Sequence, residues 1–290
     1  MFESPSPFRV RRSSARLWAL RTAFGAVGRV APGVAARWAE TIFCTPPRHE
    51  VRGTEEAFIA TGRGLVVPWE GERLAAWEWG VGPTVVLAHG WGSRAGRMAG
   101  LAAALLAARF RVILYDAPAH GVSTGRFASL PEFSRALRAV TDAVGPVYGL
   151  AGHSLGGAAI SLALHGGLEA DRAVLIAPPS DVVIFSQAFA EHVGLPPRAH
   201  AAMRRNLEAR LRVRWDDIHI PTLAREIRAP VLVLHDREDT DVPFVHAEEI
   251  VGSWPQARLV ATNGLGHRAI IRDPAVIRAI VEFLREGVAG

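Results

Sequence analysis

The stretch LAGHSLGGAA at residues 150–159 places one serine, Ser154, between Gly152 and Gly156. The residues before it, PVYGLAG, are typical of a buried strand, and those after it, LGGAAISLALH, of a helix. A sharp strand-to-helix turn exposes a serine hydroxyl and strains its backbone, and small residues two positions away on either side let strand and helix approach. The pattern therefore predicts a nucleophile, although this motif alone also fits a glycine-rich turn with an incidental serine.

A serine hydroxyl becomes a good nucleophile only beside a histidine base that a carboxylate orients. Both residue types follow later strand-like runs, in the required order. The segment VLVLHDREDTDVP carries several carboxylates directly after an apolar run, and ATNGLGHRAII carries His267 after the last one. Because the carboxyl ends of parallel strands meet at one edge of a sheet, we expect these side chains to converge on Ser154. The carboxylates are those of Asp236, Glu238, Asp239 and Asp241.

The elements that must position these residues can be read from hydrophobic periodicity. From Pro83 onward, six apolar runs without polar alternation alternate with stretches of helical length, which is typical of a parallel sheet buried on both faces. Before them, residues 57–68 and 72–80 indicate two paired strands joined by a turn at Gly71. We expect an α/β fold: a mostly parallel central sheet with antiparallel N-terminal strands, helices on both faces and a short helical cap insertion.

Two segments lie outside this alternation. Residues 181–228 are too long for an ordinary connection and read as a cap over the sheet edge where ligands bind. Residues 15–42 read as an amphipathic helix divided near Pro32, which either packs on the domain or lies on a membrane or a partner. The expected organisation is an N-terminal helical extension at 1–50, a core at 51–180 and 229–290, and the cap at 181–228.

With these elements in place, the chain resembles the α/β-hydrolase family over about residues 65–287. The family's acid loop, Gly-x-x-Asp-x-x-Val-Pro, aligns with residues 236–243 and implies Asp239 as the acid, with Asp241 as a weaker alternative. Asp236 stands where the family has glycine, and we expect it to be structural. The resemblance implies His267, which follows Leu-Gly, as the base.

The resemblance also implies an oxyanion hole made of two backbone amides, those of Trp91 in LAHGWGS and Leu155 after the nucleophile, with Gly90 as the loop glycine. His153, beside the serine, is expected to be packed rather than catalytic.

A further motif, DAPAHGVS at 116–123, matches an architectural turn of the family, except that Ala119 replaces a glycine. Asp116 and His120 are therefore not assigned to catalysis.

These residues predict a serine hydrolase that cleaves an ester or thioester through an acyl-enzyme, most simply a carboxylesterase acting on a small-molecule acyl substrate without cofactor or metal. Family branches that open haloalkanes or epoxides use aspartate as nucleophile, and Ser154 argues against them. Acyl-CoA thioesterase, lactonase, peptidase and carbon–carbon hydrolase activities use the same parts and stay open. A non-catalytic binding module on the same fold is the alternative of another class.

Composition limits the compartment and the partners. The 290 residues are 49% hydrophobic and 21% charged, as in a soluble globular enzyme. The net charge is +5, but every cation is an arginine and these are spread along the chain, so no nucleic-acid partner is expected. A single cysteine, Cys44, excludes an intramolecular disulfide and indicates a reducing, cytoplasmic location. Peripheral membrane contact through residues 15–42 is an alternative, and the sequence does not specify an oligomeric state.

Overall fold

The computed structural model describes residues 14–47 and 53–288, so parts of the expected extension, residues 1–13 and 48–50, lie outside the described residues. The chain forms two compact units. One contains the residues up to Thr45 together with Asp181–His219, and the other contains Pro46–Ser180 together with the residues from Ile220 onward. We call them the helical unit and the sheet unit.

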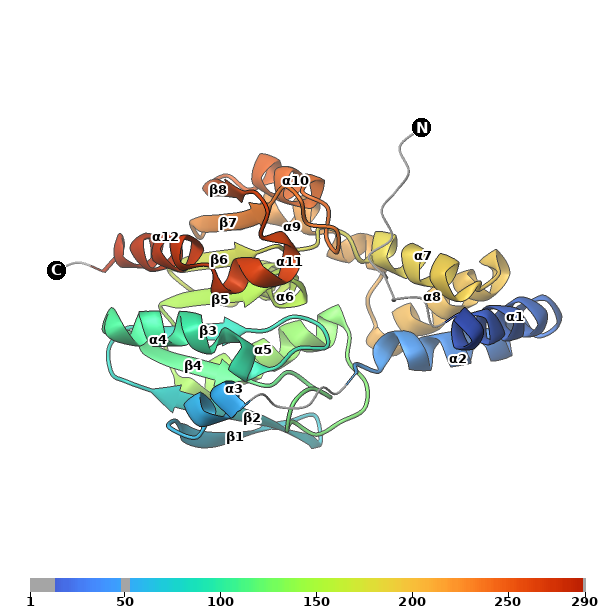
Figure 1. The fold of residues 1–290 in the computed structure, drawn as a ribbon, viewed down its shortest axis with the longest axis horizontal. Helices are drawn as coiled ribbons and strands as arrows, with labels where there is room; N and C mark the ends of the chain where they lie inside the picture. The colour runs from blue at the N-terminus through green and yellow to red at the C-terminus, as the bar shows by residue number, and fades with distance from the viewer. Residues whose placement is uncertain (1–13, 48–52, 289–290) are drawn as a thin grey trace. The chain divides into compact units, whose positions relative to one another are not determined.

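The sheet unit is built on eight strands in the order β1-β2-β4-β3-β5-β6-β7-β8 (Figure 1). β1 and β2 are antiparallel to each other, β2 is antiparallel to β4, and the remaining neighbours are parallel. The expected fold class is thereby confirmed. The strands are β1 (Arg63–Trp69), β2 (Glu72–Trp79), β3 (Thr84–Ala88), β4 (Arg111–Tyr115), β5 (Gly149–His153), β6 (Arg172–Ile176), β7 (Val231–Asp236) and β8 (Ala257–Thr262).

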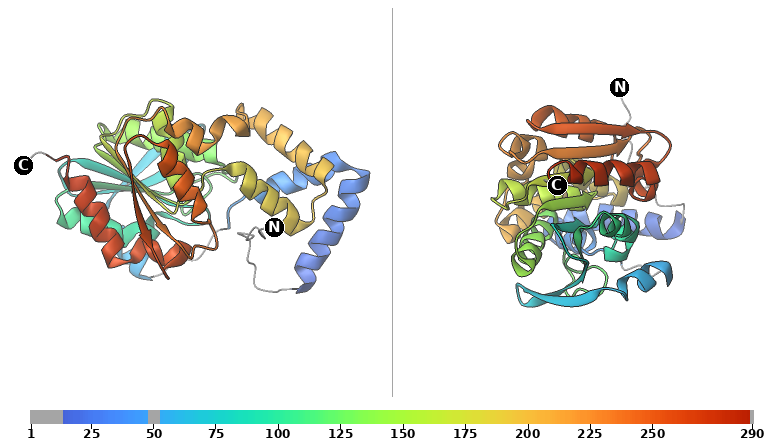
Figure 2. Two further views of the ribbon diagram at one scale, coloured as in Figure 1. Left: turned by 90° about the horizontal axis from the view of Figure 1, so that it is seen from above. Right: turned by 90° about the vertical axis from the view of Figure 1, so that its left-hand side faces the viewer.

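Helices cover both faces of this sheet, which explains why its central strands are apolar without alternation (Figure 2). α4 (Ala99–Ala107) and α12 (Pro274–Arg285) share one hydrophobic core with β3 to β7. α5 (Leu130–Val144) and α6 (Leu155–His165) pack against each other on the opposite face. The shorter helices of this unit are α3 (Gly53–Ile59), η1 (Ala95–Met98), α9 (Ile220–Ala224), α10 (Val245–Ser253), α11 (Gly266–Ala269) and η3 (Ile270–Arg272).

One part of the expected first strand is wrong. Residues 57–59 belong to α3, and β1 begins only at Arg63. The helix carries two glutamates in its first turn, where acidic side chains complement the helix dipole. One of them, Glu55, is buried against the guanidinium of Arg94 at 2.6 Å, and Arg97 lies 3.3 Å away. This long-range ion pair overrides the strand-like composition of the segment.

The register of the parallel strands aligns the three chain segments that carry the predicted site. His153 at the end of β5 pairs with Ile176 of β6, and Asp236 at the end of β7 pairs with Thr262 of β8. The turn after β5 and the loops after β7 and β8 therefore leave the sheet at the same edge.

The helical unit contains α1 (Ser14–Val30), α2 (Pro32–Cys44), α7 (Val182–Val193), α8 (Pro197–Leu211) and η2 (Trp215–Ile218). The predicted division near Pro32 is confirmed: Ala31 leaves helical geometry, and Pro32 opens the first turn of α2. No described helix is long and apolar enough to span a bilayer.

Segments far apart in the sequence share the interior of the helical unit. Phe43 of α2 packs on Phe189 of α7 and on Trp215, with ring centroids 5.1 and 6.4 Å apart. The guanidinium of Arg21 donates hydrogen bonds to two carbonyl groups near the end of α7, each 2.8 Å long. These contacts group the N-terminal helices with residues 181–219, while α9 lies in the sheet unit. The domain boundaries drawn from the sequence stay a prediction.

Candidate active site

Ser154 lies at the sharp turn between β5 and α6, with φ 53° and ψ −123°. A non-glycine residue rarely adopts a positive φ, and such strain persists only where the surrounding structure imposes it. The Ser154 amide donates a hydrogen bond of 2.8 Å to the carbonyl of Ile176 on β6, which fixes the turn to the sheet. Ser154 as a residue is only partly buried, so the turn is open to solvent.

The three glycines predicted around Ser154 are each required by close contact. A Cβ at Gly152 would lie 2.5 Å from the carbonyl carbon of Gly156, and a Cβ at Gly156 would collide with the carbonyl oxygen of Ala88. A Cβ at Gly90 would lie 2.9 Å from the Cβ of Ser154. The loop after β3 therefore runs directly against the serine.

The loops after β7 and β8 bring Asp239 and His267 together. His267 Nδ1 lies 2.8 Å from Asp239 Oδ2, so the imidazole donates to the carboxylate through this nitrogen. The other carboxylate oxygen of Asp239 accepts hydrogen bonds from the amides of Asp241 and Val242, at 2.9 and 2.8 Å. The Asp239 side chain is fully buried and the His267 side chain is 12% exposed. Nδ1 of the imidazole is thus hydrogen-bonded to Asp239, and Nε2 is the ring nitrogen available for proton transfer.

Burial by itself raises the pKa of the Asp239 carboxyl, but hydrogen bonds from His235, His267 and the Val242 amide outweigh burial and hold that pKa well below its usual value. Asp239 is therefore a carboxylate at any ordinary pH. The weaker candidate, Asp241, turns away from this pair, since its Oδ2 lies 3.5 Å from Nε of Arg268.

His153 links the serine turn to the histidine loop. Its Nε2 donates a hydrogen bond of 2.8 Å to the carbonyl oxygen of His267, and the two rings are 4.8 Å apart. Burial, with the neighbouring His267, lowers the pKa of His153 to about 3, so this imidazole is neutral. The sequence analysis expected a packed side chain here, and it missed the contact with His267 because nothing local signals a partner 114 residues away.

The hydroxyl of Ser154 has no hydrogen-bond partner among the described residues. The structure thus brings Asp239 and His267 into contact and places Ser154 beside them through His153, but it contains no hydrogen bond from Ser154 to His267. Hydrogen bonds of this kind commonly tighten only when substrate is bound.

The two predicted oxyanion donors flank the serine. Leu155 is the first residue of α6 and Trp91 lies in the loop after β3, and within residues 14–47 and 53–288 neither amide donates a hydrogen bond. Free amides at a helix N-terminus and in a neighbouring loop are suited to binding negative charge. The loop is held by His120, whose Nε2 accepts a hydrogen bond of 3.0 Å from the Gly92 amide, while the Trp91 ring packs edge-on against the His120 ring.

Asp116 has a structural role and does not contact His267. It is buried and accepts hydrogen bonds from the amides of Ala95 and Val122, at 2.8 and 2.9 Å. It therefore holds the turn at residues 116–123 together. In the described part of the chain, no group of three or more histidine, cysteine or acidic side chains is arranged to hold a metal ion.

Residues 85–280 match the sequence model of the alpha/beta hydrolase family. The chain belongs to this family. Among curated proteins, this hydrolase is 26% identical, over 238 residues, to a pimeloyl-[acyl-carrier protein] methyl ester esterase of Nitrosomonas europaea, which covers 67% of this chain and 92% of the relative.

Solved structures of the same fold include further hydrolases. The esterase Pf2001 of Pyrococcus furiosus superposes with a TM-score of 0.65 at 21% identity, covering 83% of this chain and 98% of the esterase. A monoacylglycerol lipase of Paleococcus ferrophilus superposes with a TM-score of 0.59 at 25% identity, and the match covers 73% of this chain and 98% of the lipase. The chain is therefore an enzyme of the alpha/beta hydrolase family with esterases among its relatives.

Proposed function

We propose that this enzyme is a serine hydrolase that cleaves carboxylic esters through an acyl-enzyme on Ser154. The observation that carries the proposal is the hydrogen-bonded pair of Asp239 and His267 at the same sheet edge as the strained turn of Ser154. A serine, a carboxylate and an imidazole in this chain order form the nucleophilic arrangement of the family.

The geometry assigns a role to each atom of the pair. Since Nδ1 of His267 faces Asp239, Nε2 is the nitrogen that takes the proton of the Ser154 hydroxyl as its oxygen attacks the ester carbonyl carbon. Nε2 then gives this proton to the leaving alkoxide, which departs as the alcohol. Water, deprotonated by the same nitrogen, then attacks the acyl carbon of the acyl-enzyme. The bond from that carbon to the Ser154 oxygen breaks, Nε2 returns the proton to this oxygen, and the carboxylic acid is released. Asp239 stays ionised and stabilises the imidazolium throughout.

The developing negative charge on the carbonyl oxygen is assigned to the amides of Trp91 and Leu155. Losing one oxyanion-hole donor typically costs about 3 kcal/mol of transition-state stabilisation. Because both donors belong to the backbone, the Trp91 side chain, 36% exposed, remains available to contact the acyl group.

An oxygen ester is the substrate class that we propose, because the relative from Nitrosomonas europaea is by name a methyl ester esterase. Acyl-CoA thioesters and lactones pass through the same tetrahedral intermediate, and they are the alternatives that the experiment must separate.

The test is a panel of p-nitrophenyl esters of increasing chain length beside acyl-CoA thioesters and lactones, with the Ser154→Ala variant as the blank. A fluorophosphonate probe, followed by mass spectrometry of the labelled peptide, identifies the nucleophile. The matched control is Ser180→Ala, because Ser180 is a buried serine whose hydroxyl lies 2.6 Å from His246 Nδ1 but outside the strained turn. We expect wild type and Ser180→Ala to be labelled at Ser154 and to hydrolyse esters. An unlabelled Ser154 in folded protein would favour a non-catalytic binding module.

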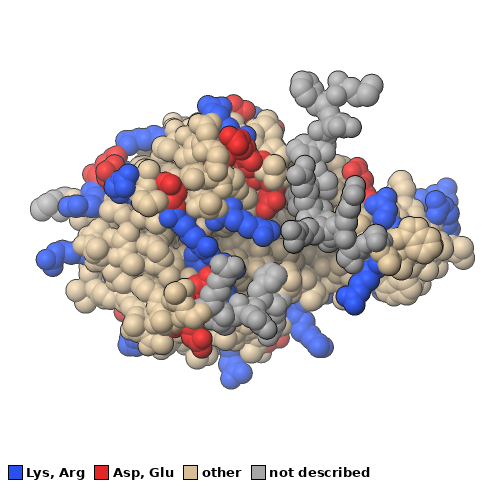
Figure 3. Space-filling model, in the orientation of Figure 1, with Lys and Arg blue, Asp and Glu red and all other residues tan. Residues whose placement is uncertain are grey.

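We also propose a cytoplasmic location with peripheral membrane contact through the N-terminal helices. Val34, Trp38 and Ile42 recur every fourth residue of α2 and stay 37%, 48% and 44% exposed, so they form one apolar stripe. Arg37 lies beside this stripe, exposed and without an acidic partner among the described residues. Aromatic and cationic side chains on one helix face are suited to an anionic lipid surface. On the face shown in Figure 3, the remaining arginines are interspersed with acidic residues.

Co-sedimentation with phosphatidylglycerol vesicles, compared with phosphatidylcholine vesicles, tests the membrane proposal. Trp38→Ser with Ile42→Ser should lower binding to the anionic vesicles. Val66→Ser, which alters an exposed valine of the sheet unit, is the matched control and should leave it unchanged. The proposal would be contradicted if the variant with Trp38→Ser and Ile42→Ser bound the anionic vesicles as well as Val66→Ser does. Self-association through the stripe, measured by analytical ultracentrifugation, would also contradict it.

A further inference from the structure

We infer that Asp236 is a positioning residue that holds the Asp239 loop and the His267 loop in one arrangement, an inference that rests on the proposed function. Asp236 is the last residue of β7 and is fully buried. It occupies the position where the acid-loop pattern of the family has a glycine, so its role does not follow from that pattern.

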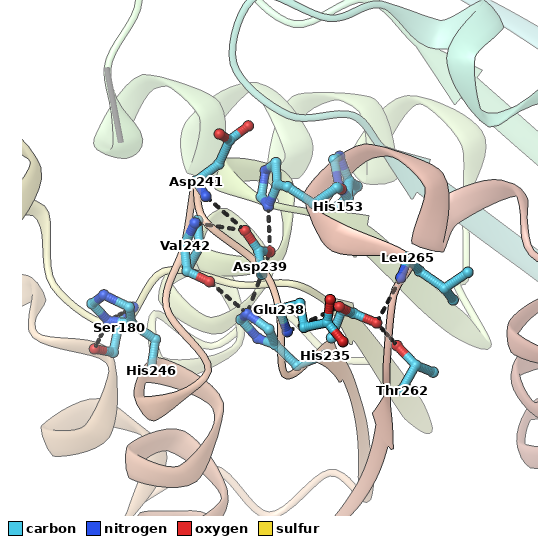
Figure 4. A network of polar contacts seen from close by, with 12 residues as sticks. His153, Ser180, His235, Glu238, Asp239, Asp241, Val242, His246, Thr262 and Leu265 are labelled. Atoms are coloured by element: carbon cyan, nitrogen blue, oxygen red, sulfur yellow. Dashed lines mark hydrogen bonds and ion pairs between the residues drawn. The ribbon is translucent and has the colours of Figure 1, made fainter. Parts of the chain in front are cut away.

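The Asp236 carboxylate accepts hydrogen bonds from both loops. One oxygen accepts from the Thr262 hydroxyl at 2.7 Å and from the Leu265 amide at 3.0 Å, both on the way to His267 (Figure 4). The other oxygen accepts from the Glu238 amide at 3.0 Å, one residue before Asp239. A single side chain thereby ties together the segments that carry the acid and the base.

The histidine loop is shaped around this carboxylate. Gly264 and Gly266 adopt left-handed backbone conformations, with φ of 77° and 60°, and the Gly266 amide also donates to Asp236. Turns of this kind present successive amides to one anion. A glycine at position 236 would leave these donors without their acceptor, at a cost of about 1–3 kcal/mol for each buried group left unpaired.

The charge on Asp236 is stable in this setting. Burial raises the pKa of its carboxyl, but hydrogen bonds from Thr262 and from the amides of Leu265, Gly266 and Glu238 outweigh burial and leave the pKa below its usual value. The backbone carbonyl of Asp236 also accepts from the Asp239 amide at 3.2 Å. The ionised form of Asp236 is therefore favoured, and in this form it serves as an anionic anchor for both loops.

Asp236 affects catalysis indirectly, through the distance between His267 and Asp239. Gly266 adjoins His267, and Asp239 lies three residues beyond Asp236, so the contact between Nδ1 and Oδ2 depends on how this one carboxylate holds both loops. A misplacement of about 1 Å in a catalytic group can cost about 10²-fold in rate. Substrate binding makes no use of Asp236, so the loss should fall on kcat.

The experiment compares Asp236→Asn and Asp236→Gly with Asp273→Asn in ester hydrolysis. Asn keeps one acceptor oxygen and Gly keeps none, so we expect kcat to fall about tenfold and about 100-fold, respectively, with KM within about twofold of wild type. Asp273→Asn is the matched control, because it changes a carboxylate that also accepts hydrogen bonds from two amides, those of Ala275 and Val276 at 2.9 and 3.0 Å, but at the start of α12, where it holds neither the Asp239 loop nor the His267 loop. It should leave kcat within about threefold.

Thr262→Val keeps the volume of the side chain and removes one donor to Asp236, so it serves as the second variant if Asp236→Asn fails to fold. We expect a fall in kcat of about threefold in the wild-type background and no further fall in Asp236→Asn. A downfield proton resonance from Nδ1–H of His267 should weaken in the same order.

The outcomes separate this inference from the proposed function. Ester hydrolysis that survives in Ser154→Ala would overturn the proposed function itself. If Ser154→Ala is inactive but folded Asp236→Asn, or Thr262→Val in its place, has the kcat of wild type, the positioning role is wrong. A raised KM with an unchanged kcat would also overturn it, because that result assigns the residue to substrate binding.

Discussion

The imidazole of His267 and the carboxylate of Asp239 are joined by a hydrogen bond of 2.8 Å between Nδ1 and Oδ2, although 28 residues separate them in the chain. This bond fixes the orientation of the ring and leaves Nε2 for the chemistry. The bond also selects Asp239 as the partner of His267 over Asp236 and Asp241, which lie within the same six residues.

Removing the nucleophile or the base should abolish turnover. We expect Ser154→Ala and His267→Ala each to lower kcat by at least about 10⁴-fold, because residues of such a unit act together and the residual rate comes from oxyanion binding alone. Steady-state hydrolysis of a p-nitrophenyl ester measures the effect, with circular dichroism to show that each variant is folded. A residual kcat within tenfold of wild type for either variant would remove that residue from the mechanism.

The two aspartates of the acid loop should behave differently. Asp239→Asn is expected to lower kcat by about 10³-fold or more, because the amide no longer favours the Nδ1–H form of His267. Asp241→Asn should change kcat by less than about threefold, since its carboxylate faces the exposed Arg268 and accepts no bond from His267. A loss below tenfold for Asp239→Asn with a large loss for Asp241→Asn would reverse the assignment.

Gly90 should be sensitive to a single added methyl group. In Gly90→Ala the new Cβ would lie 2.9 Å from the Cβ of Ser154, and the loop that carries the Trp91 amide would have to move. We expect kcat to fall by about 10²-fold or more, in line with the loss of an oxyanion donor. Gly100→Ala is the control, because its Cβ would meet nothing closer than 3.9 Å within a helix, and it should keep full activity and gain stability.

Folding stability should decrease as the pH falls from 6.5 toward 4. Burial lowers the pKa of His89 to about 4, and burial with His267 lowers that of His153 to about 3, whereas both titrate near 6.5 in the unfolded chain. In this window the unfolded state binds more protons than the folded state, so the free energy of unfolding is highest above pH 6.5 and is lost on acidification. The slope should approach about 1.4 kcal/mol per pH unit for each histidine.

Urea denaturation at pH 7, 6 and 5 and at constant ionic strength measures this slope. His153→Phe keeps a buried ring but cannot take up a proton. The slope of its unfolding free energy against pH should therefore be shallower than that of wild type by about the contribution of one histidine. The same variant loses the donor to the His267 carbonyl and should also lower kcat. An unchanged slope would show that His153 is not buried in its neutral form.

The sequence by itself determined the class of the fold and predicted the sheet edge at which we propose that the chemistry takes place. Uninterrupted apolar runs alternating with helical stretches can bury both faces only as a parallel sheet under helices, and the carboxyl ends of such strands share an edge. The serine turn, the acid loop and the histidine loop each follow a run of this kind, so their convergence is a consequence of topology. The glycines around Ser154 could also be predicted, because that turn has no room for side chains.

Only the tertiary structure decided which side chains meet. Asp236, Asp239 and Asp241 are of one type within six residues, and their directions depend on the loop that follows β7: one faces the Thr262 loop, one His267 and one Arg268. The contact of His153 with His267, the burial of Glu55 that makes α3 a helix, and the grouping of α1 and α2 with residues 181–219 likewise depend on partners distant in the chain. Periodicity reports which face of an element is buried, whereas the identity of the partner is fixed only when separate segments pack together.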